Sequence, residues 1–245
     1  MNADNANKMV SMFRTLAALV LFGISFGYLE AAVVVYLRAI YDPIRQQLHP
    51  GSRPGDLFPL ISPDQLAAAG PENPRRLAIE VGREAATIIM LAAVGLAAGR
   101  NFRQSLAAFA IVFGLWNLFF YVFLRLMIGW PESLFTWDIL FLIPLPWVGP
   151  VIAPILISLT LIACGFYSLI IGGLPARLWQ WLGMIAGGLI VILSFMWDFR
   201  NTTNGGLPNP FNWPLFLSGE AIALVAFIAA ARNPKYREFR TPLDS

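Results

Sequence analysis

The chain has 245 residues, of which 58% are hydrophobic and 13% charged, and its mean hydropathy is +0.66. Soluble proteins carry about 25% charged residues, so this chain has too few polar groups to cover a water-soluble globule. The net charge is +3, but the basic residues are spread over the ends of apolar runs and form no patch, which argues against a nucleic-acid partner. The lone Cys164 and lone His49 exclude an intrachain disulfide and a bis-histidine haem, and no metal site is expected.

Six apolar runs follow one another along the chain, each about as long as the roughly 20 residues that cross the hydrocarbon core of a bilayer. The first lies at about 14–37, and its apolar stretch is longer than the core of a cleaved signal peptide, so it predicts a membrane span. The others lie at about 79–99, 104–128, 150–172, 177–198 and 214–232. The sequence therefore predicts an all-α polytopic membrane protein, with six transmembrane helices in a single membrane domain.

A further apolar segment, 134–147, lies between the third and fourth runs and is bounded by Pro131 and by Pro144, Pro146 and Pro150. A helix of this length reaches only about 20 Å, which is too short to cross the membrane. We expect a short re-entrant or interfacial segment, whose irregular backbone has to be covered by protein or line a wet cavity.

Basic residues mark one side of the predicted bundle. With six spans and the N-terminus inside, the cytoplasmic segments receive Lys8, Arg14, Arg100, Arg103, Arg177, Arg232, Lys235, Arg237 and Arg240. This bias follows the positive-inside rule and predicts a protein of the cell (inner) membrane, with the lipid bilayer around it and both termini in the cytoplasm. The longest outer loop, 41–78, contains many prolines and glycines and is expected to form an irregular cap.

Ionisable groups inside a membrane are costly, so each one is a candidate functional residue. The candidates for a ligand or proton pocket are Glu30, Glu84, Glu220, Asp138, Arg125 and Asn117. At about 1.5 Å per residue, Glu30, Glu84 and Glu220 lie about 9–10 Å below the outer boundary on three different helices. We expect these side chains to share one polar pocket that opens to the outside, with Arg125 and Asp138 at its rim.

The spacing of small residues indicates which helix faces meet protein. Gly23 and Gly27 form a GxxxG pair in the first span, and Glu30 continues the same face, so its carboxyl is expected to point into the bundle. Gly183 and Gly187 form a similar pair in the fifth span.

The same residues also admit a purely structural interpretation, in which carboxylates and arginines pair across helices and hold no ligand. For Arg38 and Arg83, near the boundary, we expect side chains that extend toward the lipid head groups. For Asn117 we expect a hydrogen bond between helices.

No catalytic motif accompanies these residues: there is no activated serine or cysteine pair, no HExxH and no phosphate-binding glycine loop. The leading hypothesis is a non-catalytic membrane subunit or binding protein, whose outer pocket meets a partner protein or a lipid- or quinone-like ligand. Two alternatives stay open. One is a proton-coupled or small-solute transporter that titrates a glutamate, and the other is an intramembrane enzyme acting on a lipid-like substrate. The sequence indicates no particular cofactor.

Overall fold

The computed structural model describes residues 3–53 and 55–232, which are mostly helical. Within these residues, six helices are long and apolar enough to cross a membrane, which confirms the predicted fold class. They are α1 (Ala3–Leu48), α3 (Asn73–Ala98), α4 (Phe102–Ile128), α5 (Ile152–Ile170), α6 (Leu178–Met196) and α8 (Trp213–Ala231). The shorter elements are α2 (Pro63–Ala68), α7 (Phe199–Thr203) and the strands β1 (Trp137–Phe141) and β2 (Trp147–Pro150).

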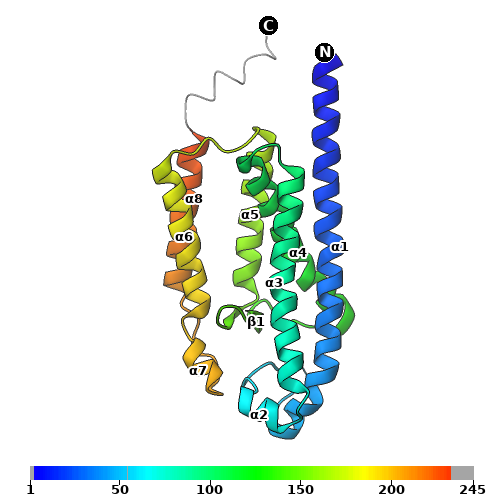
Figure 1. Cartoon of the computed structure of the whole chain (residues 1–245). Helices are drawn as coiled ribbons and strands as arrows, with labels where there is room; N and C mark the ends of the chain where they lie inside the picture. Colours follow the sequence, from blue (N-terminus) through cyan, green and yellow to red (C-terminus); the bar gives the residue numbers. More distant parts are fainter. Residues whose placement is uncertain (1–2, 54, 233–245) are drawn as a thin grey trace.

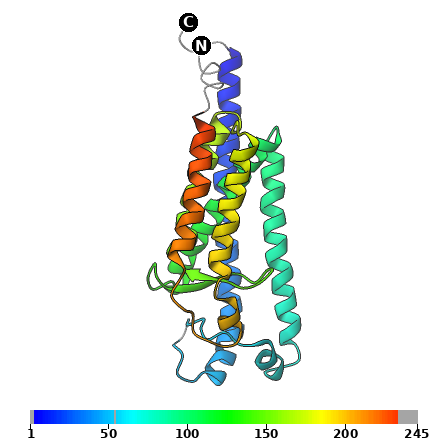
Figure 2. The ribbon, with the colours of Figure 1, turned by 90° about the vertical axis from the view of Figure 1, so that its left-hand side faces the viewer.

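The long helices stand side by side with roughly parallel axes (Figure 1). α1 begins and α8 ends at the same end of the bundle, which we call the terminal end. α2 and α7 lie toward the opposite end, which we call the loop end, and the view turned by 90° repeats this arrangement (Figure 2). This is the arrangement expected of a chain that crosses a layer an even number of times.

α4 is the centre of one group of helices, because it packs against α1, α3 and α5. Its approach to α1 is close. A Cβ atom added at Gly27 would lie 2.9 Å from both the Phe119 Cβ and the Trp116 carbonyl oxygen, and one added at Gly23 would lie 2.7 Å from the Leu115 Cβ. The GxxxG pair of the first span therefore faces protein, as predicted, and only glycine lets the two backbones approach this closely.

The second group is the pair of α6 and α8, which pack on each other and meet the rest of the molecule mainly through β2. A Cβ atom added at Gly187 would lie 2.5 Å from the Gly219 carbonyl oxygen, so glycines again permit the contact. Figure 1 shows this pair beside the group around α4.

The proline-bounded segment 134–147 forms no membrane-crossing helix, but its actual structure was not predicted: it contributes most of a two-stranded antiparallel hairpin. Asp138 of β1 lies opposite Gly149 of β2, and Trp137 lies opposite Pro150. The two strands satisfy each other's backbone groups, while Pro144 in the connection is incompatible with a regular helix. Because β2 leads directly into α5, the hairpin lies at the loop-end start of that helix (Figure 1).

The region expected as an irregular outer loop, 41–78, is shorter than predicted, because both flanking helices extend into it. α1 continues to Leu48 and α3 begins at Asn73. The intervening segment is tied back to α1, since the Arg45 Nη1 donates to the Pro59 carbonyl oxygen at 2.6 Å. This segment covers the loop-end side of the cavity described next.

Candidate functional site

A cavity of about 290 Å³ lies between α1, α3, α4, β1 and the loop segment 57–61. Its polar lining consists of Glu30, Arg38, Tyr41, Asp42 and Arg45 from α1, Glu80, Arg83, Glu84 and Thr87 from α3, Asn117 and Tyr121 from α4, and Asp138 from β1. The rest of the lining is apolar, with leucines from the loop segment and the aromatic rings of Trp116, Phe120 and Phe141. The cavity thus joins charged groups and a large apolar surface in one space.

Glu30 on α1 and Arg83 on α3 form an ion pair in the wall of this cavity. Arg83 also holds Glu80, one turn earlier on α3, with its Nη2 2.5 Å from the Glu80 Oε1. Thr87, one turn later, donates its hydroxyl to the other oxygen of Glu30 at 2.8 Å. Glu30 is only 3% exposed, so α3 supplies both the charge and the hydrogen bond that its burial requires. Arg83 therefore pairs two carboxylates, which corrects the expectation that it extends toward the head groups.

Glu84 lines the same cavity and is 7% exposed. Its Oε2 accepts a hydrogen bond from the backbone N–H of Leu142 at 2.8 Å, which ties α3 to the hairpin. No arginine among the described residues forms an ion pair with Glu84. A carboxyl that is buried with one neutral donor carries either an uncompensated charge or a proton.

Asp138 reaches the cavity from the hairpin. Its Oδ2 accepts a hydrogen bond from the Tyr121 hydroxyl at 2.7 Å, and the residue is 5% exposed. Burial raises the pKa of Asp138 to about 6, although the Tyr121 hydroxyl and the positive charge of Arg38 both act to lower it. Arg38 lies over the ring of Trp130, with its guanidinium carbon 4.2 Å from the ring centroid, so it packs on protein and does not extend to the head groups as expected.

Asn117 lines the cavity and also joins α4 to α5. Its Nδ2 donates to the Ser158 Oγ at 2.8 Å and to the Pro154 carbonyl oxygen at 3.2 Å. This is the hydrogen bond between helices that the sequence analysis expected.

Glu220 and Arg125 do not line this cavity. Glu220 lies on α8, which packs on α6, and its Oε1 is buried with no hydrogen-bond partner among the described residues. Arg125 donates instead to the carbonyl oxygens of Gly129 and Pro131, just beyond the end of α4. The expectation of one pocket for all three glutamates is thus corrected for Glu220, because equal depth on two helices does not decide which side of the bundle each helix occupies.

Tyr41, Asp42 and Arg45 were predicted to lie in the outer loop, whereas the structure brings them to the cavity on α1. The sequence contains a pattern that indicates this continuation of the helix. Arg38, Tyr41, Asp42 and Arg45 are spaced by three, one and three residues, which puts them on one face of a continuing helix. Their polarity favoured a loop, although a helix that carries a polar face at a cavity has the same composition.

No group of three or more His, Cys, Asp or Glu side chains in residues 3–53 and 55–232 is arranged to hold a metal ion. Comparison of the chain with protein-family models, curated proteins and solved structures found no match. The function is therefore inferred from the fold and the site. They define a polytopic helical membrane protein in which the buried carboxyls Glu30, Glu84 and Asp138 lie at a cavity that is otherwise largely apolar.

Proposed function

We propose that this chain is a non-catalytic, membrane-embedded binding protein whose cavity holds an amphiphilic, lipid- or quinone-like ligand. The observation that carries the proposal is the mixed wall of the cavity, in which Glu30, Glu84 and Asp138 are buried beside apolar and aromatic side chains. Ligand sites commonly combine an apolar lining with a few placed polar groups. Charged groups at membrane depth are costly, so such a cluster is a functional-site hypothesis by default.

The two parts of the wall together favour an amphiphile over simpler occupants. A small polar solute could pair with the carboxyls but would leave the apolar wall in contact with polar groups or water, which is unfavourable. A pure hydrocarbon would leave Glu84 without solvation or a counter-charge. An amphiphile meets both requirements, and a segment of a partner protein that combines an apolar surface with a polar tip is the other occupant of this kind.

Proton-coupled transport is a second candidate, because Glu84 is buried without an arginine partner among the described residues. Carboxyls at membrane depth that gain and lose a proton are a common device of transporters. Dissipation of a pH gradient by the protein in liposomes, lost in Glu84→Gln, would establish this function in place of simple binding.

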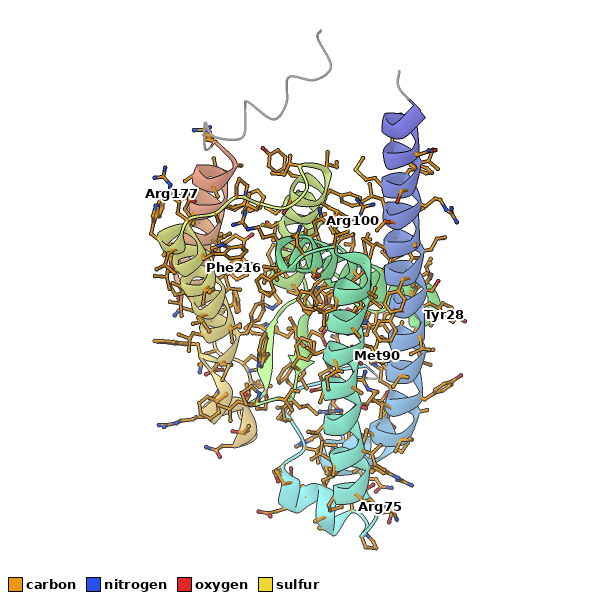
Figure 3. The ribbon with its side chains drawn as sticks, turned by 45° about the horizontal axis from the view of Figure 1, so that its top comes forward. Tyr28, Arg75, Met90, Arg100, Arg177 and Phe216 are labelled. Atoms are coloured by element: carbon orange, nitrogen blue, oxygen red, sulfur yellow. The ribbon has the colours of Figure 1, made fainter. Side chains whose placement is uncertain are left out.

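We also propose that the terminal end faces the cytoplasm of the cell, so that the cavity lies in the outer half of the membrane. Arg100 and Arg177 lie toward the terminal end and Arg75 lies at the loop end (Figure 3). Arg75 has acidic neighbours in the chain, whereas the short connections at the terminal end contain almost no acids, so the positive-inside rule favours this orientation. Lys235, Arg237 and Arg240, which add to the bias in the sequence, lie outside the described residues.

The proposed function is tested by identifying the lipids and quinones that remain bound to the purified full-length protein. We expect a retained amphiphile, and we expect Glu84→Gln to lower its amount. Glu220→Gln is the matched control, because it makes the same change on a membrane helix whose carboxyl does not line the cavity. A folded protein that retains no amphiphile, and whose thermal stability does not respond to added membrane lipids or quinones, would contradict the proposal.

A further inference from the structure

The carboxyl groups on the α3 side of the cavity outnumber the cations that accompany them. Glu30, Glu80 and Glu84 all line the cavity, and one guanidinium, that of Arg83, pairs with the first two. Within the described part of the chain, Glu84 accepts its hydrogen bond from a neutral amide, that of Leu142. A buried carboxylate in this position is stabilised by a cation or by a proton.

Two N–H donors at the same cavity have no acceptor. The indole Nε1 of Trp116 and the Nε of Arg38 are buried without a hydrogen-bond partner among residues 3–53 and 55–232. Trp116 is 6% exposed, and both residues line the cavity. Neither group can accept a hydrogen bond, so both favour a ligand atom that does, such as a phosphate, hydroxyl or carbonyl oxygen.

Aromatic rings border the same space. Trp116, Phe120 and Phe141 line the cavity, and the ring centroids of Trp116 and Phe141 lie 6.1 Å apart. The faces of such rings attract a cationic nitrogen, and more strongly where water is excluded. A cavity lined by both carboxyls and aromatic rings is therefore a favourable environment for an ammonium group.

We propose that the cavity recognises an amphiphile whose head group carries an ammonium nitrogen and neighbouring oxygen acceptors, the nitrogen facing Glu84 and separate oxygens facing the donors of Trp116 and Arg38. This inference rests on the proposed function and deepens it by naming the head group. An ethanolamine phospholipid of the bilayer and a free long-chain amino alcohol share this chemistry. A quinone supplies the acceptor but no cation, and an anionic head group without an amine is repelled by the carboxylates.

The test measures binding of three probes to the full-length protein in a neutral detergent by native mass spectrometry: phosphatidylethanolamine, N-acetylphosphatidylethanolamine and sphinganine. Acetylation removes the positive charge and leaves the phosphate and both acyl chains unchanged. We expect it to weaken binding about tenfold, the loss typical of a charge-assisted contact. Glu84→Gln should lower the binding of phosphatidylethanolamine to that of the acetylated lipid, whereas Glu220→Gln should leave both unchanged. Trp116→Phe should weaken the binding of both phospholipids equally, because both contain the oxygen acceptors.

The outcomes separate this inference from the function on which it rests. Equal binding of the two phospholipids by the unmodified protein would overturn the head-group assignment and leave amphiphile binding intact. That comparison needs no variant, so a misfolded Glu84→Gln cannot obscure it. Binding of none of the probes would overturn the head-group assignment. It would overturn the proposed function as well only if the purified protein also retains no lipid or quinone. A preference for sphinganine over phosphatidylethanolamine would support the ammonium site and assign a free amino alcohol as its source.

Discussion

Glu30 and Glu220 are the same residue type at similar predicted depths along their helices, yet the structure gives them different surroundings. Glu30 receives a guanidinium from Arg83 and a hydroxyl from Thr87, whereas Glu220 has one buried oxygen with no partner among the described residues. The free energy of burying a carboxyl depends on such partners far more than on depth itself. A carboxyl at membrane depth therefore indicates a site only after its neighbours are known.

Asp138 lies in the hairpin between the membrane spans, and we expect its titration to make the stability of the protein depend on pH. Its pKa is about 6 in the folded protein, above the ordinary value of 3.8. The folded state thus binds the proton more tightly than the unfolded state, and the resulting stabilisation is fully present below pH 3.8 and is lost as the pH rises through 6. A rise of the pKa from 3.8 to about 6 limits this stabilisation to about 3 kcal/mol.

Thermal unfolding of the detergent-solubilised protein from pH 4 to pH 8 measures this effect against Asp138→Asn, whose amide does not titrate. We expect the unfolding temperature of the unmodified protein, relative to that of the variant, to be higher at pH 4 than at pH 7.5. A difference between the two proteins that does not change with pH would show that Asp138 titrates near its ordinary pKa.

At the scale of the helices, glycine decides where backbones meet. Gly27→Ala is expected to destabilise the protein by about 1–3 kcal/mol, because the added methyl would overlap the backbone of α4 at Trp116 and Phe120. Gly82→Ala on α3 is the matched control, since its added Cβ meets no atom within 4 Å. That change should be neutral or stabilising by up to about 1 kcal/mol through helix propensity.

Thermal unfolding temperatures of the two glycine variants in the same detergent test this close approach of α1 and α4. Equal temperatures for Gly27→Ala and Gly82→Ala would mean that α1 and α4 do not approach each other as closely as the structure indicates. A lower temperature for Gly27→Ala alone is the expected result.

The hairpin shows what the sequence pattern of a short segment leaves undecided. The prolines that bound 134–147 exclude a spanning helix, and the segment is also too short to cross the membrane as a helix. Neither property distinguishes a short helix from two paired strands. The choice depends on partners distant in the sequence, since Leu142 donates to Glu84 and Asp138 accepts from Tyr121.

At the scale of the whole molecule, six crossings require the connection at Arg100 and the connection at Asn204 to lie on opposite sides of the membrane. Both residues are exposed. Single cysteines at these positions, in a Cys164→Ser background, report their sides through labelling of intact cells with a membrane-impermeant thiol reagent. We expect label at Asn204→Cys and none at Arg100→Cys.

The possible results separate the number of spans from their orientation. Label at both positions, or at neither in cells that are accessible to the reagent, would contradict six spans. Label at Arg100→Cys alone would keep the six spans and reverse the proposed orientation, because the positive-inside rule would then have failed for this chain.

The number of membrane helices and the inward direction of Glu30 follow from the sequence by itself. Both depend on local properties: the length of an apolar run, and the three-to-four spacing that puts Gly23, Gly27 and Glu30 on one face. Only the tertiary structure decides which helices are neighbours. It joins Glu30 to Arg83 across 53 residues of sequence, brings the hairpin to Glu84, and places Glu220 on a helix that packs on α6. Periodicity along one helix determines which of its faces is covered by protein. Which neighbouring helix covers that face depends on side-chain packing between helices, and no single helix encodes that packing.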